Sequence, residues 1–211
     1  MKGFFTSLFV GGCVLLVGAG CAASPLAFTP TEEVPSSQDP SLSSGSISTT
    51  TSMPQWTYQG QLPAERITGK IARVSTKYGD IVIRLFGDTA PLTVSNFVYL
   101  TEGGYYNGLT FHRREEGFVI QGGDPSGNGS GGPGYSFEDE LNDDYTYVRG
   151  MVAMANRGPD TNGSQFFIML DDAPLPKAYS IFGEVLEGMD VVDQVRKGDV
   201  MTTVTIEGSG E

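Results

Sequence analysis

FHRREEGFVIQGGD, residues 111–124, is the most informative stretch of this 211-residue chain. It places a guanidinium (Arg113), an aromatic ring (Phe118) and an amide (Gln121) around a short apolar run. The guanidinium keeps its charge at any working pH. We predict a strand over residues 118–121. Strand geometry alone would send Phe118 and Gln121 to opposite faces, because successive side chains alternate.

A second stretch, MANRGPDTNGSQFFI, occupies residues 154–168. Its Asn-Arg-Gly-Pro run breaks any regular element, so Ala155 and Asn156 should present main-chain N–H and C=O groups at a cleft edge. An extended peptide could add there as a strand. The Asn-Gly pair at 162–163 is a strong tight-turn signal. It leads into a predicted strand over 165–169, in which neighbouring phenylalanines face opposite sides and one of them belongs to the core.

Together the two stretches resemble the signature of the cyclophilins, which are peptidyl-prolyl cis/trans isomerases. The resemblance implies that Arg113, Gln121 and Phe118 are catalytic. It implies a substrate-binding set of Phe118, Val119, Gln121, Ala155, Asn156, Gln165, Phe167, Leu175 and Tyr179. It assigns Phe167 to the proline pocket and places both Phe118 and Gln121 at the active cleft, which requires a bend near Gly117. It implies no cofactor.

The chemistry of Arg113 and Gln121 agrees with this interpretation. Proline isomerisation makes and breaks no covalent bond, and its barrier is amide resonance of about 18–20 kcal/mol. A guanidinium can donate to the amide nitrogen once twisting has made it basic, and Gln121 can hold the substrate carbonyl without adding charge. The alternative is that Arg113 is a surface group paired with Glu115 or Glu116. The second stretch favours the catalytic interpretation.

His112 is the only histidine of the chain. A base or metal ligand is conceivable because the reference pKa of histidine lies near neutrality. However, bond rotation needs no general base, and a single His without further ligands at metal spacing does not make a zinc site. We therefore expect a buried, hydrogen-bonded imidazole and no metal site.

A third stretch, LPKAYSIFG at residues 175–183, matches the resemblance more loosely through Leu175 and Tyr179. The familiar eukaryotic cyclophilins carry a Trp immediately before that Leu, where this chain has Pro174, and its only Trp is Trp56. Catalysis should survive the change, because the resemblance puts the Trp at the rim. High affinity for cyclosporin-type inhibitors is not expected.

The first 65 residues have a different character. Residues 1–20 combine a Lys with a short apolar run and small residues, which is typical of a secretory signal peptide. Cys21, after Gly-Ala-Gly, resembles the lipid-modified cysteine of bacterial lipoproteins. An ordinary signal peptide cut near Ala23, or an uncleaved anchor, remains an alternative. Residues 21–65 are rich in Ser, Thr and Pro and are predicted to be a disordered tether, with a weak packing role for Trp56 and Tyr58.

From residue 66 to 211 we predict one globular domain of ordinary size. Strands are expected over 67–75, 80–86 and 200–206, and helices over 90–100 and 189–195. Short strands with two helices suit a mainly β, closed antiparallel barrel. The resemblance makes this the eight-stranded cyclophilin barrel. The Gly-rich segment 126–134 has no Lys-Ser/Thr after it, so we predict a long surface loop rather than a phosphate site.

The net charge is −12, which argues against nucleic-acid binding, since that requires a basic face. The resemblance implies a peptidyl-prolyl isomerase without a cofactor, which we expect to be monomeric. It would act on proline-containing segments of exported or envelope proteins, lipid-anchored on the outer side of a membrane. A peptide-binding or chaperone module with incidental turnover, or an interaction protein in which the tether matters most, are the alternatives.

Overall fold

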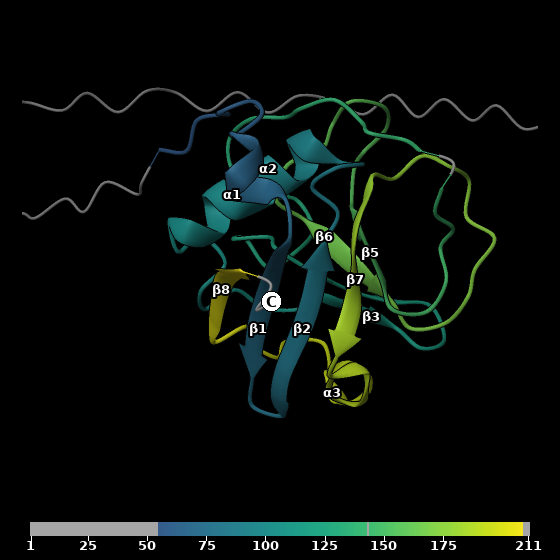
Figure 1. Cartoon of the computed structure of the whole chain (residues 1–211). Helices are drawn as coiled ribbons and strands as arrows, with labels where there is room; N and C mark the ends of the chain where they lie inside the picture. Colours follow the sequence, from purple (N-terminus) through teal and green to yellow (C-terminus); the bar gives the residue numbers. More distant parts are fainter. Residues whose placement is uncertain (1–54, 143, 209–211) are drawn as a thin grey trace, which may run out of the picture. The chain divides into compact units, whose positions relative to one another are not determined.

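The computed structural model describes residues 55–142 and 144–208, and residues 1–54 with the predicted signal segment, Cys21 and most of the tether lie outside it. The elements follow chain order (Figure 1). They are α1 (Ala64–Ile67), β1 (Lys70–Thr76), β2 (Gly79–Leu85), α2 (Pro91–Glu102), β3 (Arg113–Glu115), β4 (Val119–Gly122), β5 (Met151–Met154), β6 (Phe166–Met169), β7 (Ile181–Glu187), α3 (Met189–Gln194) and β8 (Thr203–Gly208).

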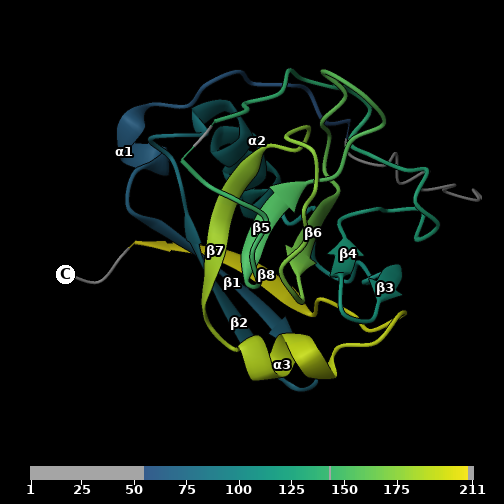
Figure 2. The same cartoon turned by 90° about the vertical axis from the view of Figure 1, so that its right-hand side faces the viewer.

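All eight strands belong to one curled antiparallel sheet with the order β3-β4-β6-β5-β7-β2-β1-β8 (Figures 1 and 2). The predicted closed barrel is wrong, because the sheet is an open half-barrel whose end strands, β3 and β8, are not paired in the described part of the chain. The segments preceding these two strands approach each other instead. Phe111 N donates to Asp199 O at 2.8 Å and Met201 N donates to Leu109 O at 2.8 Å. Irregular loop contacts thus occupy the place of a final strand pair.

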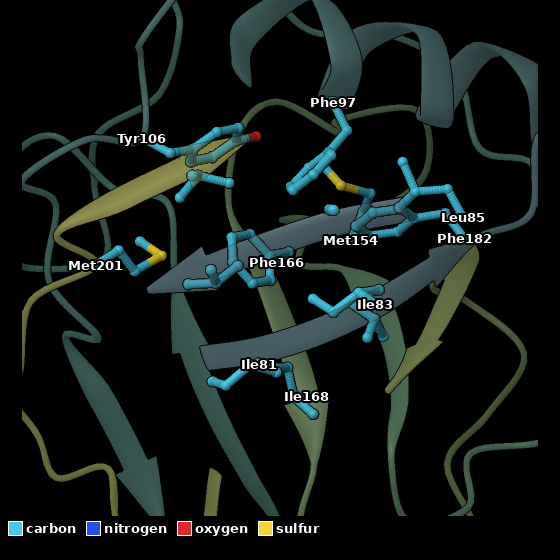
Figure 3. Close-up of a cluster of buried hydrophobic side chains, with 14 of the residues drawn as sticks. Ile81, Ile83, Leu85, Phe97, Tyr106, Met154, Phe166, Ile168, Phe182 and Met201 are labelled. Atoms are coloured by element: carbon cyan, nitrogen blue, oxygen red, sulfur yellow. The ribbon is translucent and has the colours of Figure 1, made fainter. Parts of the chain in front are cut away.

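The main hydrophobic core fills the concave side of the sheet beneath α2 (Figure 3). Phe97 of α2 packs edge-on against Phe166 of β6, with ring centroids 5.7 Å apart, and also against Phe182 of β7. Every residue of β6 is buried. β6 is therefore a continuous apolar run, as expected for a strand buried on both faces. Phe167 and Met169 belong to a second apolar cluster on the opposite face of the sheet.

The predicted helices are present with small shifts, and α1 adds a single turn that the sequence analysis did not predict, giving three helices in the described residues. α2 begins at Pro91, which suits the first turn because the missing N–H would have no helical partner. Its N-cap residue, Ala90, supplies no side-chain bond. The carboxylate of Glu140 replaces the cap by accepting from Leu92 N at 2.9 Å and Thr93 N at 2.8 Å.

Residues 55–62 cross α2 without forming a helix or strand, and we call them the N-terminal strap. Side chains at even positions are half-buried and those at odd positions are exposed, which is the period of an extended chain on a surface. The Trp56 ring contacts Tyr99 and Tyr105 edge-on, with centroids 5.6 and 5.3 Å apart. The packing predicted for Trp56 is confirmed, and ordered packing begins upstream of the predicted boundary at residue 66.

Candidate active site

The second apolar cluster, which we call the outer patch, lies on the face of the sheet opposite the main core. It brings together the predicted pocket residues Val119 of β4 and Phe167 of β6 with the partly buried Phe118, Leu175 and Tyr179. The buried side chains around them are Phe86, Tyr147, Ala153, Met169 and Ile181. The Tyr179 ring meets Phe167 edge-on at 5.5 Å. Five separate segments of chain therefore build one apolar surface.

Phe118 joins the outer patch because it stands before β4 rather than within it. Gly117 has φ +66°, a left-handed conformation that glycine adopts without steric cost. The turn closes where Phe118 N donates to Glu115 O at 3.1 Å. The bend expected near Gly117 is thus present, and Phe118 and Val119 contribute to the same cluster although they are neighbours in sequence.

Arg113 lies at the edge of the outer patch, opposite Gln121 in the β3–β4 pair. Its guanidinium carbon is 5.9 Å from the centre of the Phe118 ring, and its Nη1 donates to Gln121 Oε1 at 3.0 Å. Nε and Nη2 donate to Glu115 Oε1 at 2.9 and 2.6 Å. The surface pairing considered as an alternative is therefore real. A guanidinium has five N–H groups, so two remain beyond these three bonds.

A chain of amides orients Gln121. Its Nε2 donates to Gln165 Oε1 at 2.9 Å. Gln165 in turn donates from Nε2 to Gly129 O at 3.0 Å and to Gly131 O at 2.8 Å. A continuous chain of hydrogen bonds thus leads from Arg113 through Gln121 and Gln165 to the Gly-rich segment. Gln121 keeps one N–H for another acceptor, because a primary amide has two.

Ala155 and Asn156 follow β5 and border the same region, but their groups are engaged differently from the prediction. Ala155 N donates to Gln165 O at 2.9 Å, so this N–H is not free to pair with an added peptide strand. Asn156 Nδ2 donates to Ala178 O at 2.7 Å. Asn156 therefore fastens the loop that carries Leu175 and Tyr179 beside the outer patch.

Two residues of the site were missed by the sequence analysis, Tyr147 and Tyr145. Tyr147 Oη donates to Tyr179 O at 2.9 Å and accepts from Tyr179 N at 3.1 Å, which holds the backbone of Tyr179 in place. Tyr145 stacks on Phe86 with ring centroids 4.3 Å apart. The only local signal was the spacing of the two tyrosines by two, in a segment without regular secondary structure.

A cleft of about 410 Å³ adjoins the outer patch across Gln121. One wall consists of the segment 129–136 and the other of residues around Asn156 and Thr161, with Ser164 and Gln165 between them. The Gly-rich segment, predicted to be a surface loop, therefore also lines the cleft. Arg157 ties this loop to the opposite wall by donating from Nη2 to Ser130 O at 2.6 Å.

His112 is 7% exposed, and burial lowers the pKa of its imidazole. Neither ring nitrogen has a hydrogen-bond partner among the described residues. The expectation of a buried ring is confirmed, but the expected hydrogen bonding is wrong. The ring lies near the carboxylate of Asp124, which accepts backbone N–H groups from Ser126, Asn128 and Gly129 and is thereby committed to the loop.

The family model of the cyclophilin type peptidyl-prolyl cis-trans isomerases matches residues 71–210. The chain belongs to this family. A peptidyl-prolyl cis-trans isomerase of Helicobacter pylori is 43% identical over 142 residues, covering 65% of this chain and 87% of that protein. The peptidyl-prolyl cis-trans isomerase-like 3 protein of Gallus gallus is 47% identical over 127 residues, covering 58% and 79%.

Solved structures agree with the sequence relatives. A cyclophilin type isomerase of Cryptosporidium parvum superimposes with a TM-score of 0.63 at 34% identity, covering 67% of this chain and 99% of that one. The same isomerase in the presence of the dipeptide Ala-Pro gives a TM-score of 0.62 at 35% identity. The protein is thus a peptidyl-prolyl cis-trans isomerase of the cyclophilin type. Within the described ranges, no helix has the length and apolar character needed to cross a bilayer.

Proposed function

We propose that the domain binds a proline-containing peptide with the proline ring on the outer patch and the preceding residues along the cleft. Phe118, Val119 and Phe167 would contact the ring, and Leu175 and Tyr179 would border it. The observation that carries the proposal is the position of the Arg113 guanidinium beside Phe118 and Gln121, at the edge of an apolar surface. The Cryptosporidium relative was solved in the presence of a dipeptide ending in proline, which is consistent with binding of a proline-containing peptide.

In the proposed mechanism Arg113 acts on the amide as it twists. The ground-state amide nitrogen shares its lone pair with the carbonyl and accepts no hydrogen bond, whereas the twisted nitrogen does. One of the two uncommitted N–H groups of Arg113 would donate to it. Because this bond exists only in the twisted state, it lowers the barrier rather than tightening ground-state binding. The remaining N–H of Gln121 would hold the carbonyl of the residue before the proline.

A binding module with incidental turnover is the second candidate. The bonds from Arg113 to Glu115 favour it, because a guanidinium held by a carboxylate is a weaker donor to substrate. The two functions separate in one experiment on the full chain: NMR exchange spectroscopy with an X-Pro peptide. Exchange between cis and trans peptide at substoichiometric protein supports the isomerase. Peptide binding without faster exchange supports the binding module.

We further propose that the isomerase works outside the cytoplasm, anchored through a lipid on Cys21. The support is the order of features in the sequence: a charged and apolar leader, small residues before Cys21, then a Ser/Thr/Pro-rich stretch. A single acyl chain anchors only reversibly, so stable attachment requires more than one. A flexible stretch of this length would let the domain range tens of ångströms from the surface, where it would meet exported chains before they fold.

Mass spectrometry of the mature N-terminus tests the anchor. A diacylated or triacylated Cys21 at the N-terminus is expected, and Cys21→Ser should release the protein from membranes or block its processing. An unmodified N-terminus downstream of Cys21 would contradict the anchor and leave a secreted isomerase.

A further inference from the structure

The N-terminal strap contacts the back of the cleft wall through Tyr58. The Tyr58 ring stacks nearly parallel on Phe137, with centroids 5.4 Å apart and an interplanar angle of 6°. It also contacts Tyr135, with centroids 5.7 Å apart. Tyr135 lines the cleft, and Phe137 is 3% exposed. The strap is therefore one residue layer away from the space that the peptide is proposed to occupy.

Both residues under Tyr58 are linked by hydrogen bonds to the segment 162–163, Phe137 through its main chain and Tyr135 through Asn96 of α2. Phe137 N donates to Asn162 O at 3.0 Å, and Asn162 N donates back to Phe137 O at 3.2 Å. Tyr135 Oη donates to Asn96 Oδ1 at 2.8 Å, and Asn96 Nδ2 donates to Gly163 O at 2.8 Å. Asn162 stands between two cleft residues in the sequence. Movement of Tyr58 would thus reach both walls of the cleft.

The strap also contacts the cleft indirectly through Trp56. Its indole contacts the ring of Tyr105, whose hydroxyl forms a 2.9 Å hydrogen bond with the hydroxyl of Ser164, a residue of the cleft. The indole lies directly over Gly103, where an added Cβ would overlap the ring. The absence of a side chain at Gly103 lets the ring approach the helix end closely. Two aromatic side chains of the strap thus support the cleft at separate points.

The cleft wall formed by residues 129–136 has a backbone that is poorly restrained by its own sequence. Glycines occupy four positions of the segment 129–136, at 129, 131, 132 and 134, and this segment forms neither helix nor strand. Glycine loses more conformational freedom on ordering than any other residue, so a defined wall depends on contacts from outside the loop. Gln165 and Arg157 provide such contacts at residues 129–131. The strap provides them at residues 135 and 137.

We infer that the N-terminal strap is a positioning element of the cleft, which sets the shape of the wall facing the residues that precede the proline. The inference rests on the proposed placement of the peptide. Tyr58 touches no substrate atom and acts through Tyr135 and Phe137. Because the contact is made away from Arg113, the strap should influence how peptides bind and which are preferred, and should leave the rotation step itself nearly unchanged.

The test compares the full chain with its Tyr58→Ala variant on X-Pro peptides that differ in the residue X. We expect KM to rise about 3- to 10-fold, the range in binding that one or two aromatic pairs can account for, with kcat nearly unchanged and an altered order of preference among X. Amide hydrogen exchange should become faster at Phe137 and Asn162. Gln59→Ala is the matched strap control, because Gln59 points to solvent and should change neither reading.

Ile206→Ala supplies the control for general loss of stability, because Ile206 is partly buried against the main core in β8. If KM and amide hydrogen exchange are both unchanged in Tyr58→Ala, the inference is wrong. It is also wrong if Ile206→Ala changes KM and hydrogen exchange as much as Tyr58→Ala does. The parent chain could isomerise all X-Pro peptides at the same rate while amide hydrogen exchange at Phe137 is still faster in Tyr58→Ala. That result would contradict the proposed peptide placement and would support the stabilisation of the cleft wall by the strap.

Discussion

Arg113 and Arg114 are neighbours in β3 with opposite surroundings. Arg113 is 43% exposed at its side chain and lies beside Phe118, whereas Arg114 is 9% exposed and donates from Nη1 to Val195 O at 2.9 Å near the end of α3. The alternation of a strand sends one guanidinium to the outer patch and the other toward a helix end. The pair therefore offers a matched comparison between an arginine proposed to be catalytic and a structural one.

Arg113→Ala should lower kcat/KM by about 10²–10³-fold, by analogy with the removal of one preorganised donor, and should leave the urea midpoint nearly unchanged. Arg113→Lys should also be poor, because a compact ammonium does not reproduce the planar fork. Arg114→Ala should lose about 1–3 kcal/mol of stability, since it removes charge-assisted hydrogen bonds to the carbonyl groups of Val192 and Val195, with near-normal turnover. Equal activity of Arg113→Ala and the parent chain would refute the proposed mechanism.

His112 makes the stability depend on pH in a defined window. Burial lowers the pKa of His112 in the folded state, so the unfolded chain binds the proton more readily. The free energy of unfolding should be highest above the ordinary histidine pKa near 6.5. It should decrease as the pH falls from there toward the pKa of His112 in the folded protein. Urea unfolding at pH 7.5 and 5.5 measures the difference. The carboxyl groups with lowered pKa, such as Asp124 and Asp199, lose their contribution at lower pH.

His112→Gln should flatten this dependence between pH 7.5 and 5.5, because the chain has no other histidine. A slope that survives the substitution would assign the effect to another group. The expected loss is modest, since the neighbouring Asp124 carboxylate partly offsets the effect of burial.

At the scale of single residues, the resemblance grouped Phe118, Val119, Phe167, Leu175 and Tyr179 and required a bend near Gly117, but it missed Tyr145 and Tyr147. The pairing of Arg113 with Glu115 was left open as an alternative, and the bond from Ala155 N to Gln165 O was not predicted. That second bond depends on the register between β5 and β6, such as the pairing of Met154 with Phe166. A single sequence carries no direct signal of that register.

At the scale of elements, α2 takes its N-terminal cap from a residue 48 positions away in sequence. Glu140 lies in an acidic run whose backbone is fixed where Glu140 N donates to Ser180 Oγ at 2.8 Å. A carboxylate at a helix N-terminus satisfies free N–H groups and interacts favourably with the helix dipole. The acidic run is visible in the sequence at residues 138–140, but its capping role depends on the folded loop.

Glu140→Gln should therefore cost about 1 kcal/mol of unfolding free energy, measured by urea denaturation. Glu138→Gln is the control, because Glu138 is exposed in the same run and carries the same charge. If both variants shift the midpoint equally, net charge rather than capping explains the effect.

Long elements were easier to predict than short ones. The alternation of β1 and β2 and the proline at the start of α2 were visible in the sequence, because each pattern extends over seven or more residues. β3 and β5 have three and four residues. β3 consists of Arg-Arg-Glu and contains no apolar residue. The four-residue apolar run of β5 fits either a strand or a helix, and no tight-turn signal such as the Asn-Gly before β6 precedes it.

At the scale of the whole molecule, the strap extends the domain beyond its predicted start. The sequence analysis assigned the strap to the tether because the residues before it are rich in Ser and Thr. The apolar residues at even positions, Trp56, Tyr58 and Leu62, could have indicated that it packs on the domain. Leu62 N also donates to Ser95 Oγ of α2 at 2.8 Å. The open half-barrel could not be distinguished from a closed barrel by strand count alone, because closure depends on whether the two end strands pair.

Trp56 is the only tryptophan of the chain, so its fluorescence reports on the strap alone. If the strap folds cooperatively with the domain, urea transitions followed by Trp56 emission and by far-UV circular dichroism should coincide. Thr57→Ala, at an exposed position of the strap, should leave both unchanged. An earlier fluorescence transition would contradict cooperative docking.

The sheet order has a consequence for the timing of synthesis. β1 lies between β2 and β8, and the Arg73–Glu207 pair that joins β1 to β8 spans 134 residues of sequence. At roughly 5–20 residues per second a ribosome reaches β8 about 7–27 s after β1. Until β7 is made, β1 and β2 can pair only with each other, and a two-stranded hairpin is marginal in water. Until β8 is made, β1 keeps one edge unpaired. The nascent chain therefore stays short of its native sheet for nearly the whole translation of the domain, which leaves it open to chaperones for that time.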